Sequence, residues 1–191
     1  IEAARRFSDA LRKGGRADRA AQIANEALGR FPEDRELQTT LGLAQLASGR
    51  PQEALSPLIQ VGQAEPQNWR VRSALGAALD QLGRFDDARR VYAEAITLAP
   101  NEPRILTNMG VSYILSGDPD EAEPLLRRAV EQQGAPPEAR QNLAIALALQ
   151  GNFAEAEQIE RVDLPPAQAA QNMQYLRGLL SDPRRWNDLG R

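Results

Sequence analysis

Glycine recurs at a fixed spacing of 34 residues along this chain of 191 residues. The glycines are Gly15, Gly49, Gly83, Gly117 and Gly151, and alanine keeps the same spacing at Ala20, Ala54, Ala88, Ala122 and Ala156. A constant period of this length indicates that one small structural unit is repeated and that neighbouring units stack on each other. The period therefore predicts a helical solenoid that offers a binding surface and has no evident catalytic centre.

Placing these glycines at position 15 divides the chain, without insertions, into the windows 1–34, 35–68, 69–102, 103–136 and a partial 137–170. The third window is the clearest. Its positions 7, 8, 11, 15, 17, 20, 24, 27 and 32 hold Leu75, Gly76, Leu79, Gly83, Phe85, Ala88, Tyr92, Ala95 and Pro100. This order of large, small and proline residues resembles the tetratricopeptide repeat (TPR) consensus. The resemblance implies an all-α fold, a right-handed superhelix of about five helix-turn-helix repeats.

The positions of each predicted hairpin have distinct physical roles. The first helix of a repeat, helix A, is expected to end at the glycine of position 15, which adopts a left-handed conformation. The second, helix B, begins at a proline in two repeats, Pro51 and Pro119, because the first turn of a helix needs no N–H group. A small residue at position 8 of helix A allows helix B to cross closely; it is Gly42, Gly76, Gly110 or Ala144.

The C-terminal part of the chain departs from the repeat. The stretch 162–166 contains two prolines and is expected to end the fifth helix B early. A last amphipathic helix is predicted over about 166–181, with an apolar face of Met173, Leu176, Leu179 and Leu180. It would cap the array, whose last repeat has no following neighbour. In the tail 182–191, Trp186 and Leu189 are either a docking hook or a segment folded onto the last helix.

Composition excludes several classes of function. The chain has no cysteine and no histidine, which removes disulfides, Ser-His and Cys-His nucleophile pairs and the usual zinc sites. The net charge of −3 does not suit a nucleic-acid-binding surface. No apolar run has the ~20 residues of a membrane span. We therefore predict a protein that is not an enzyme and uses no cofactor or metal.

The concave surface of such an array is lined by helix A, and the TPR register places positions 2, 5, 9, 12 and 13 on it. Several of these positions are apolar, which suits an amphipathic helix or a hydrophobic peptide. Coverage by the protein's own C-terminal helix, or a tight superhelix, is the alternative explanation. The predicted apolar groove residues are Leu43, Leu46, Ala77, Val111, Ile114, Leu115, Ile145 and Leu149, and the polar ones are Thr39, Arg70, Ser73, Arg104, Asn108 and Asn142.

Some TPR domains bind the C-termini of chaperones through a clamp of basic and amide side chains. Arg70, Arg104, Asn108 and Asn142 imitate part of such a clamp. The match is poor, because position 5 should be basic or an amide. It is Thr39, Ser73, Thr107 or Gln141.

Residues 161–180 contain the sequence DLPP and then YLR, and Trp186 follows them. This stretch resembles the C-terminus of the TadD family of Tad (Flp) pilus assembly proteins in alphaproteobacteria. The resemblance implies an outer-membrane lipoprotein that faces the periplasm and acts as a pilotin-like scaffold for the pilus secretin. The family's signal peptide and lipidated cysteine are not in this sequence. Because Ile1 is not an initiator residue, we expect a fragment or a processed form, attached to a membrane only through a lipid anchor outside these residues.

Two other functions are open at this point. One is a cytoplasmic co-chaperone or adaptor that binds the acidic C-terminal peptide of a partner. The other, an enzyme, would require a fused domain outside this sequence.

Overall fold

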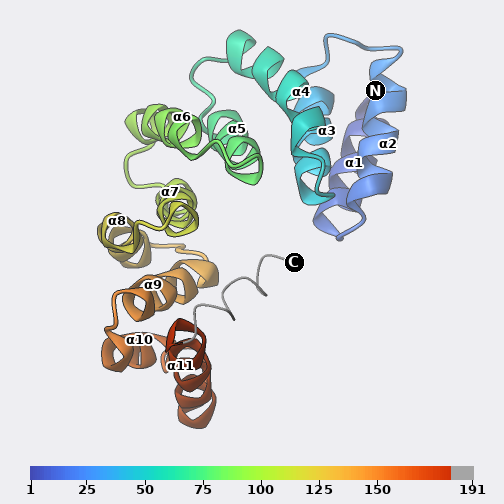
Figure 1. Ribbon diagram of the computed structural model, residues 1–191. Coiled ribbons are helices and arrows are strands. Elements are labelled where there is room, and N and C mark those ends of the chain that lie inside the picture. The colour runs from blue at the N-terminus through green and yellow to red at the C-terminus, as the bar shows by residue number, and fades with distance from the viewer. Residues whose placement is uncertain (182–191) are drawn as a thin grey trace. The chain divides into compact units, whose positions relative to one another are not determined.

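The computed structural model describes residues 1–181, and all regular structure in that range is α-helical. The helices are α1 (Glu2–Lys13), α2 (Ala17–Leu28), α3 (Arg35–Ala47), α4 (Pro51–Ala64), α5 (Trp69–Gln81), α6 (Phe85–Leu98), α7 (Pro103–Ser116), α8 (Pro119–Glu131), α9 (Pro137–Leu149), α10 (Phe153–Glu160) and α11 (Pro166–Ser181). Each 34-residue window contains one pair of helices, and the fifth window also contains the first residues of α11 (Figure 1). The predicted fold class, helical hairpins followed by a C-terminal helix, is confirmed.

The chain forms two compact units, which we call unit 1 (residues 1–100) and unit 2 (from residue 101). Unit 1 contains three hairpins, in which each helix A (α3 or α5) packs on the helix B before it. Alanines of α2 share a core cluster with Leu37, Leu41 and Ala44 of α3. A second cluster joins α4 to α5 through Leu58, Val61 and Val71, among others. Stacking of one hairpin on the next therefore produces the core.

Unit 2 contains two hairpins and the helix α11. Its core joins α8, α9 and α10 through Leu126, Leu143 and Ala156, and α11 adds Met173 and Leu176. Leu179 of α11 is also buried. The predicted amphipathic helix therefore lies where the sequence places it and covers the last hairpin. Trp186 and Leu189 lie outside the described residues.

The second, third and fourth hairpins close by inserting a large side chain of helix B over a glycine of helix A. A β-carbon at Gly42 would lie 2.6 Å from Cγ of Leu58, one at Gly76 would lie 2.5 Å from Cε1 of Tyr92, and one at Gly110 would lie 2.6 Å from Cγ of Leu126. No real side chain tolerates such distances, so the small residue at position 8 sets the helix spacing. The first repeat reverses the sizes, with Ser8 at position 8 and Ala24 at position 24, both fully buried.

The third hairpin adds a polar contact to this arrangement. The hydroxyl of Tyr92 donates a hydrogen bond to Oδ2 of the buried Asp80, 2.9 Å away. Burial, together with the charge of Asp80, raises the pKa of Tyr92 far above its ordinary value, so the hydroxyl stays protonated. The contact satisfies two polar groups inside the hairpin.

The ends of the helices follow the local sequence. All five glycines at position 15 have positive φ, between 69° and 87°. Gly117, for example, ends α7 in the left-handed conformation that other residues adopt at a cost. Pro51 and Pro119 begin α4 and α8 as expected. Asp34 and Asn68 accept hydrogen bonds from the first turns of α3 and α5.

Candidate functional site

A cleft of about 360 Å³ lies on the helix A surface of unit 1. Residues of α1, of α3 and of the segment that joins α4 to α5 surround it: Glu2, Arg5, Arg6, Asp9, Arg35, Glu36, Thr39, Thr40, Leu43, Glu65 and Asn68. Thr39 and Leu43 are thus predicted groove residues that line a hollow surface. Glu2, Arg5 and Asp9 were not predicted. They occupy positions 2, 5 and 9 of the first repeat, and extending the register to that repeat identifies them.

Ion pairs organise this cleft. The Nε atom of Arg5 donates to both carboxylate oxygens of Asp34 at 3.0 and 3.1 Å. Asp34 also accepts the N–H of Leu37 at 2.9 Å and thereby caps α3. Arg6 pairs with Glu2 at 2.7 Å, and Arg35 pairs with Glu65 at 3.8 Å. The cleft therefore presents neutralised charges of both signs, which does not resemble a basic clamp for carboxylates.

The carboxylate of Asp34 links this site to stability. Burial alone would raise its pKa, but the hydrogen bonds from Arg5 and Leu37 and the charge of Arg5 outweigh burial and lower the pKa below its ordinary value. A carboxyl group whose pKa is lower in the folded state than in the unfolded state stabilises the folded protein at pH values above its unfolded-state pKa, which is about 3.9 for Asp. That stabilisation is lost as the pH falls through the folded-state pKa.

We therefore expect Asp34→Asn to be less sensitive to acid than the parent protein. Urea unfolding of both proteins between pH 7 and strongly acidic pH would measure the difference between their free energies of unfolding. The difference should be largest near neutral pH and should shrink as the pH falls, because protonated Asp34 no longer binds Arg5 as an ion. A difference that is constant with pH contradicts the role given to this ion pair.

Two predicted groove residues of unit 1 are unavailable to a partner. Leu46 is only 9% exposed because it belongs to the core cluster between α3, α4 and α5. Ser73 is 5% exposed on α5. Ala77 is half-buried and packs against the same cluster. Arg70 is exposed, and its guanidinium stacks on the ring of Trp69 with 4.4 Å to the centroid.

In unit 2, four aliphatic side chains occupy positions 9 and 13 of two neighbouring A helices. We call Val111 and Leu115 of α7, with Ile145 and Leu149 of α9, the unit 2 apolar surface. Leu115 is 57% exposed, and the other three are half-buried. The core cluster that α11 joins includes none of the four, whereas Ile114 packs against it. Ile114 therefore contributes to the core more than to a binding surface.

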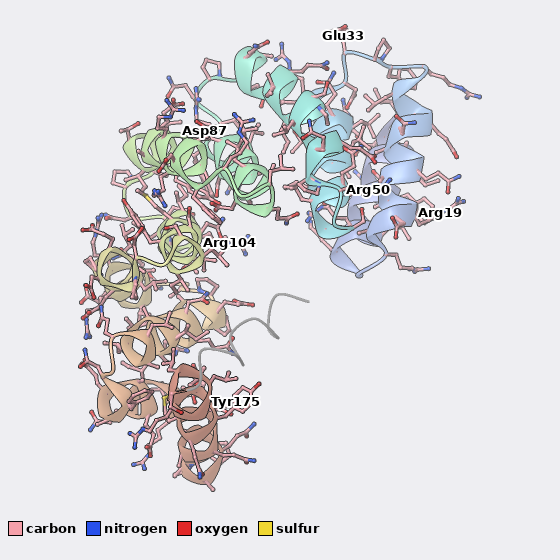
Figure 2. All side chains as sticks on the ribbon, in the orientation of Figure 1. Arg19, Glu33, Arg50, Asp87, Arg104 and Tyr175 are labelled. Atoms are coloured by element: carbon pink, nitrogen blue, oxygen red, sulfur yellow. The ribbon has the colours of Figure 1, made fainter. Side chains whose placement is uncertain are left out.

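The polar predicted residues of unit 2 lie on the same two helices. Asn108 and Asn142 are half-buried at position 6 of α7 and α9. Arg104 is exposed near the start of α7, where Figure 2 labels it. Over residues 1–181, no group of three or more acidic side chains is placed to hold a metal ion. No helix in the same range is both long enough and apolar enough to cross a membrane.

Family models for the tetratricopeptide repeat match residues 5–65, 45–107 and 113–181, which together span most of the chain. The chain belongs to the tetratricopeptide repeat family. Proteins built from this repeat generally mediate protein–protein interactions and are not catalysts, and no feature of residues 1–181 points to an enzymatic activity. No curated protein matches the sequence significantly.

Solved structures agree with the family. A thermophilic TPR protein of Thermus thermophilus superposes with a TM-score of 0.78 at 24% identity, over 95% of this chain and 99% of that one. MamA of MSR-1 is 34% identical and has a TM-score of 0.58, over 67% of this chain and 74% of its own. A TPR protein of Parabacteroides merdae covers 99% of this chain and 77% of its own, with a TM-score of 0.68 at 21% identity. The narrower resemblance to TadD stays a prediction.

Proposed function

We propose that this TPR protein is a scaffold that binds an apolar segment of a partner protein on the unit 2 apolar surface. The observation that carries the proposal is the position of Val111, Leu115, Ile145 and Leu149. They lie at equivalent places on two packed A helices, and they stay outside the cluster that forms the core. Aliphatic side chains at this spacing suit the apolar face of a helix or an extended hydrophobic peptide. The charged cleft of unit 1 is a separate surface with different chemistry.

We infer further that the partner belongs to a Tad (Flp) pilus, with its secretin as the first candidate. The support for this partner is the resemblance of residues 161–180 to the TadD family. These residues lead into the capping helix α11 and include most of it. In this proposal the protein works in the periplasm as a pilotin-like factor. It is held at the outer membrane by a lipid anchor outside these residues.

Charging the unit 2 apolar surface tests the binding proposal. We expect the double substitution Val111→Asp and Ile145→Asp to abolish capture of the secretin in a pull-down with purified proteins. Helicity should be retained, and the melting temperature should fall, because both side chains are half-buried. The single substitution Leu115→Asp avoids any loss of packing, because this side chain is mostly exposed. It should weaken binding at least about tenfold, which corresponds to about 1.4 kcal/mol.

The matched control is Ile59→Asp, which makes the same kind of change at an exposed aliphatic side chain of α4. It should leave capture intact. Capture that survives all the substitutions on the unit 2 apolar surface shows that the partner binds elsewhere. Capture of some other pilus component, with the same sensitivity to Leu115→Asp, keeps the scaffold function and replaces the secretin as the partner.

The second candidate, a cytoplasmic adaptor for acidic C-terminal peptides, is favoured by one observation. Arg70 and Arg104 are exposed, and neither has a carboxylate partner within residues 1–181. Each is therefore open to an acidic peptide. Peptide binding that falls steeply with salt and is lost in Arg70→Ala and Arg104→Ala would favour the adaptor over the pilus scaffold.

A further inference from the structure

The second repeat lacks an aliphatic side chain that other repeats have on helix B. Position 28 is aliphatic in the first, third and fourth repeats, where it is Leu28, Ile96 and Val130. Leu28 and Val130 pack against the core clusters that contain residues of α2 and α8. In the second repeat this position is Gly62, where a β-carbon would meet only Cγ1 of Val71, at 3.8 Å. The space that a larger side chain fills elsewhere is therefore open on α4.

A hollow of about 310 Å³ lies at this glycine, between α4 and α5, and we call it the Gly62 hollow. Four apolar side chains line it: Leu58, Ile59, Val71 and Leu75. Leu75, at position 7 of α5, is only half-buried. The equivalent Leu41 and Leu143 are buried, with 9% and 2% exposed. The hollow therefore uncovers part of a side chain that the neighbouring hairpin covers in other repeats.

A second departure from the repeat lies one turn earlier on the same helix. Position 25 of helix B is Ile59 in the second repeat, and in the first, third and fourth it is Asn25, Ala93 and Arg127. Ile59 is 41% exposed and stands at the hollow, because residues three apart share one face of a helix. One departure removes an aliphatic side chain and the other adds an exposed one beside the gap. Together they create an apolar surface with the character of an interaction site.

The polar groups at the Gly62 hollow suit a neutral peptide. Arg72 is the one charged residue of the described chain that lines it. Its charge is neutralised by Glu94, and its Nε and Nη2 atoms donate to the carbonyl oxygen of Pro66 at 3.1 and 3.0 Å. Gln63 also lines the hollow; it is exposed and has no hydrogen-bond partner within residues 1–181. Its amide can donate and accept, as a peptide group requires.

We propose that the Gly62 hollow binds a leucine or isoleucine side chain of a partner polypeptide. The inserted side chain takes the place that Leu28 or Val130 fills in other repeats, and Gln63 hydrogen-bonds to the partner's backbone beside it. An aliphatic anchor that fills a pocket is a common way for a few residues to dominate an interface. The site shares no residue with the unit 2 apolar surface and uses no pilus component, so it is independent of the function proposed above.

Methyl-detected NMR of the 191-residue chain tests the site with a defined probe, N-acetyl-leucine-N-methylamide. We expect saturable shifts of the methyl signals of Leu58, Ile59 and Val71, and none with N-acetyl-asparagine-N-methylamide, whose side chain has a similar size but is polar. Gly62→Leu should fill the hollow with its own side chain and weaken binding of the leucine probe at least about tenfold. This variant should melt at a higher temperature, which shows that it is folded. The control Leu115→Asp should bind the probe like the parent protein.

A second probe separates a polypeptide from other occupants. The alcohol 3-methyl-1-butanol carries the same branched chain without an amide and should bind more weakly than the leucine probe. Gln63→Ala should weaken the leucine probe about threefold and leave the alcohol unchanged, because only the leucine probe has a peptide group to bind. Equal binding of the two probes would assign the hollow to a small apolar molecule, and shifts that follow protein concentration alone would assign it to a second copy of the chain. Either result, an absence of shifts, or shifts that persist in Gly62→Leu overturns the proposal.

Discussion

Replacement of Gly76 by valine is expected to lower the free energy of unfolding by about 3 kcal/mol. The β-carbon alone would lie 2.5 Å from Cε1 and 2.7 Å from Cζ of Tyr92. The ring of Tyr92 has little room to move, because it is buried and its hydroxyl is held by Asp80 at 2.9 Å. The two helices of the third hairpin would have to separate, and the buried hydrogen bond would be strained or lost. Urea unfolding followed by circular dichroism measures the change.

The control for this prediction is Gly62→Ala in α4. A β-carbon at Gly62 meets only Cγ1 of Val71, at an ordinary contact distance of 3.8 Å. Alanine is a better helix former than glycine, so this substitution should raise the free energy of unfolding by up to about 1 kcal/mol. Equal effects of the two glycine substitutions would contradict the close approach that we assign to Gly76.

Truncation of Leu126 to alanine is the second prediction with a large effect. Leu126 is fully buried and lies over Gly110, so its removal leaves a cavity that a glycine cannot fill. We expect the free energy of unfolding to fall by about 3 kcal/mol, within the range measured for buried leucines. The measurement is the same urea titration.

The Leu126→Ala background also reverses the effect of a second substitution. In the parent protein, Gly110→Ala should destabilise, because its β-carbon would lie 2.6 Å from Cγ of Leu126. With Leu126 truncated, the same β-carbon enters the cavity, and Gly110→Ala should stabilise by up to about 1 kcal/mol through helix propensity. The first repeat contains a natural version of this exchange, with Ser8 and Ala24. Additive effects of the two substitutions would show that these residues do not share one space.

Most of the fold follows from local rules that are visible in the sequence. The left-handed glycines at position 15, the prolines that begin α4 and α8, and the small residues at position 8 each act within one hairpin. Their consequences depend on neighbours close in sequence, so a 34-residue register is enough to predict them. The position and apolar face of α11 could be predicted for the same reason, from the break after Glu160 and the spacing of its large apolar residues.

The candidate surfaces could be predicted only in part. Register alone assigned Leu46 and Val111 to the same groove, although Leu46 enters the core of unit 1 and Val111 stays outside the cluster of unit 2. Burial depends on which other helix packs over a side chain, and that information is not contained in one repeat.

By itself, then, the sequence determined the repeat, its helix boundaries and its family, because these depend on backbone conformation and on contacts inside a hairpin. Only the tertiary structure decided which side chains of that repeat remain available to a partner. It separated Leu115 from Ile114 and added the ion-paired cleft around Arg5. The physical reason is that accessibility belongs to the packing between hairpins, where residues at identical repeat positions meet different neighbours.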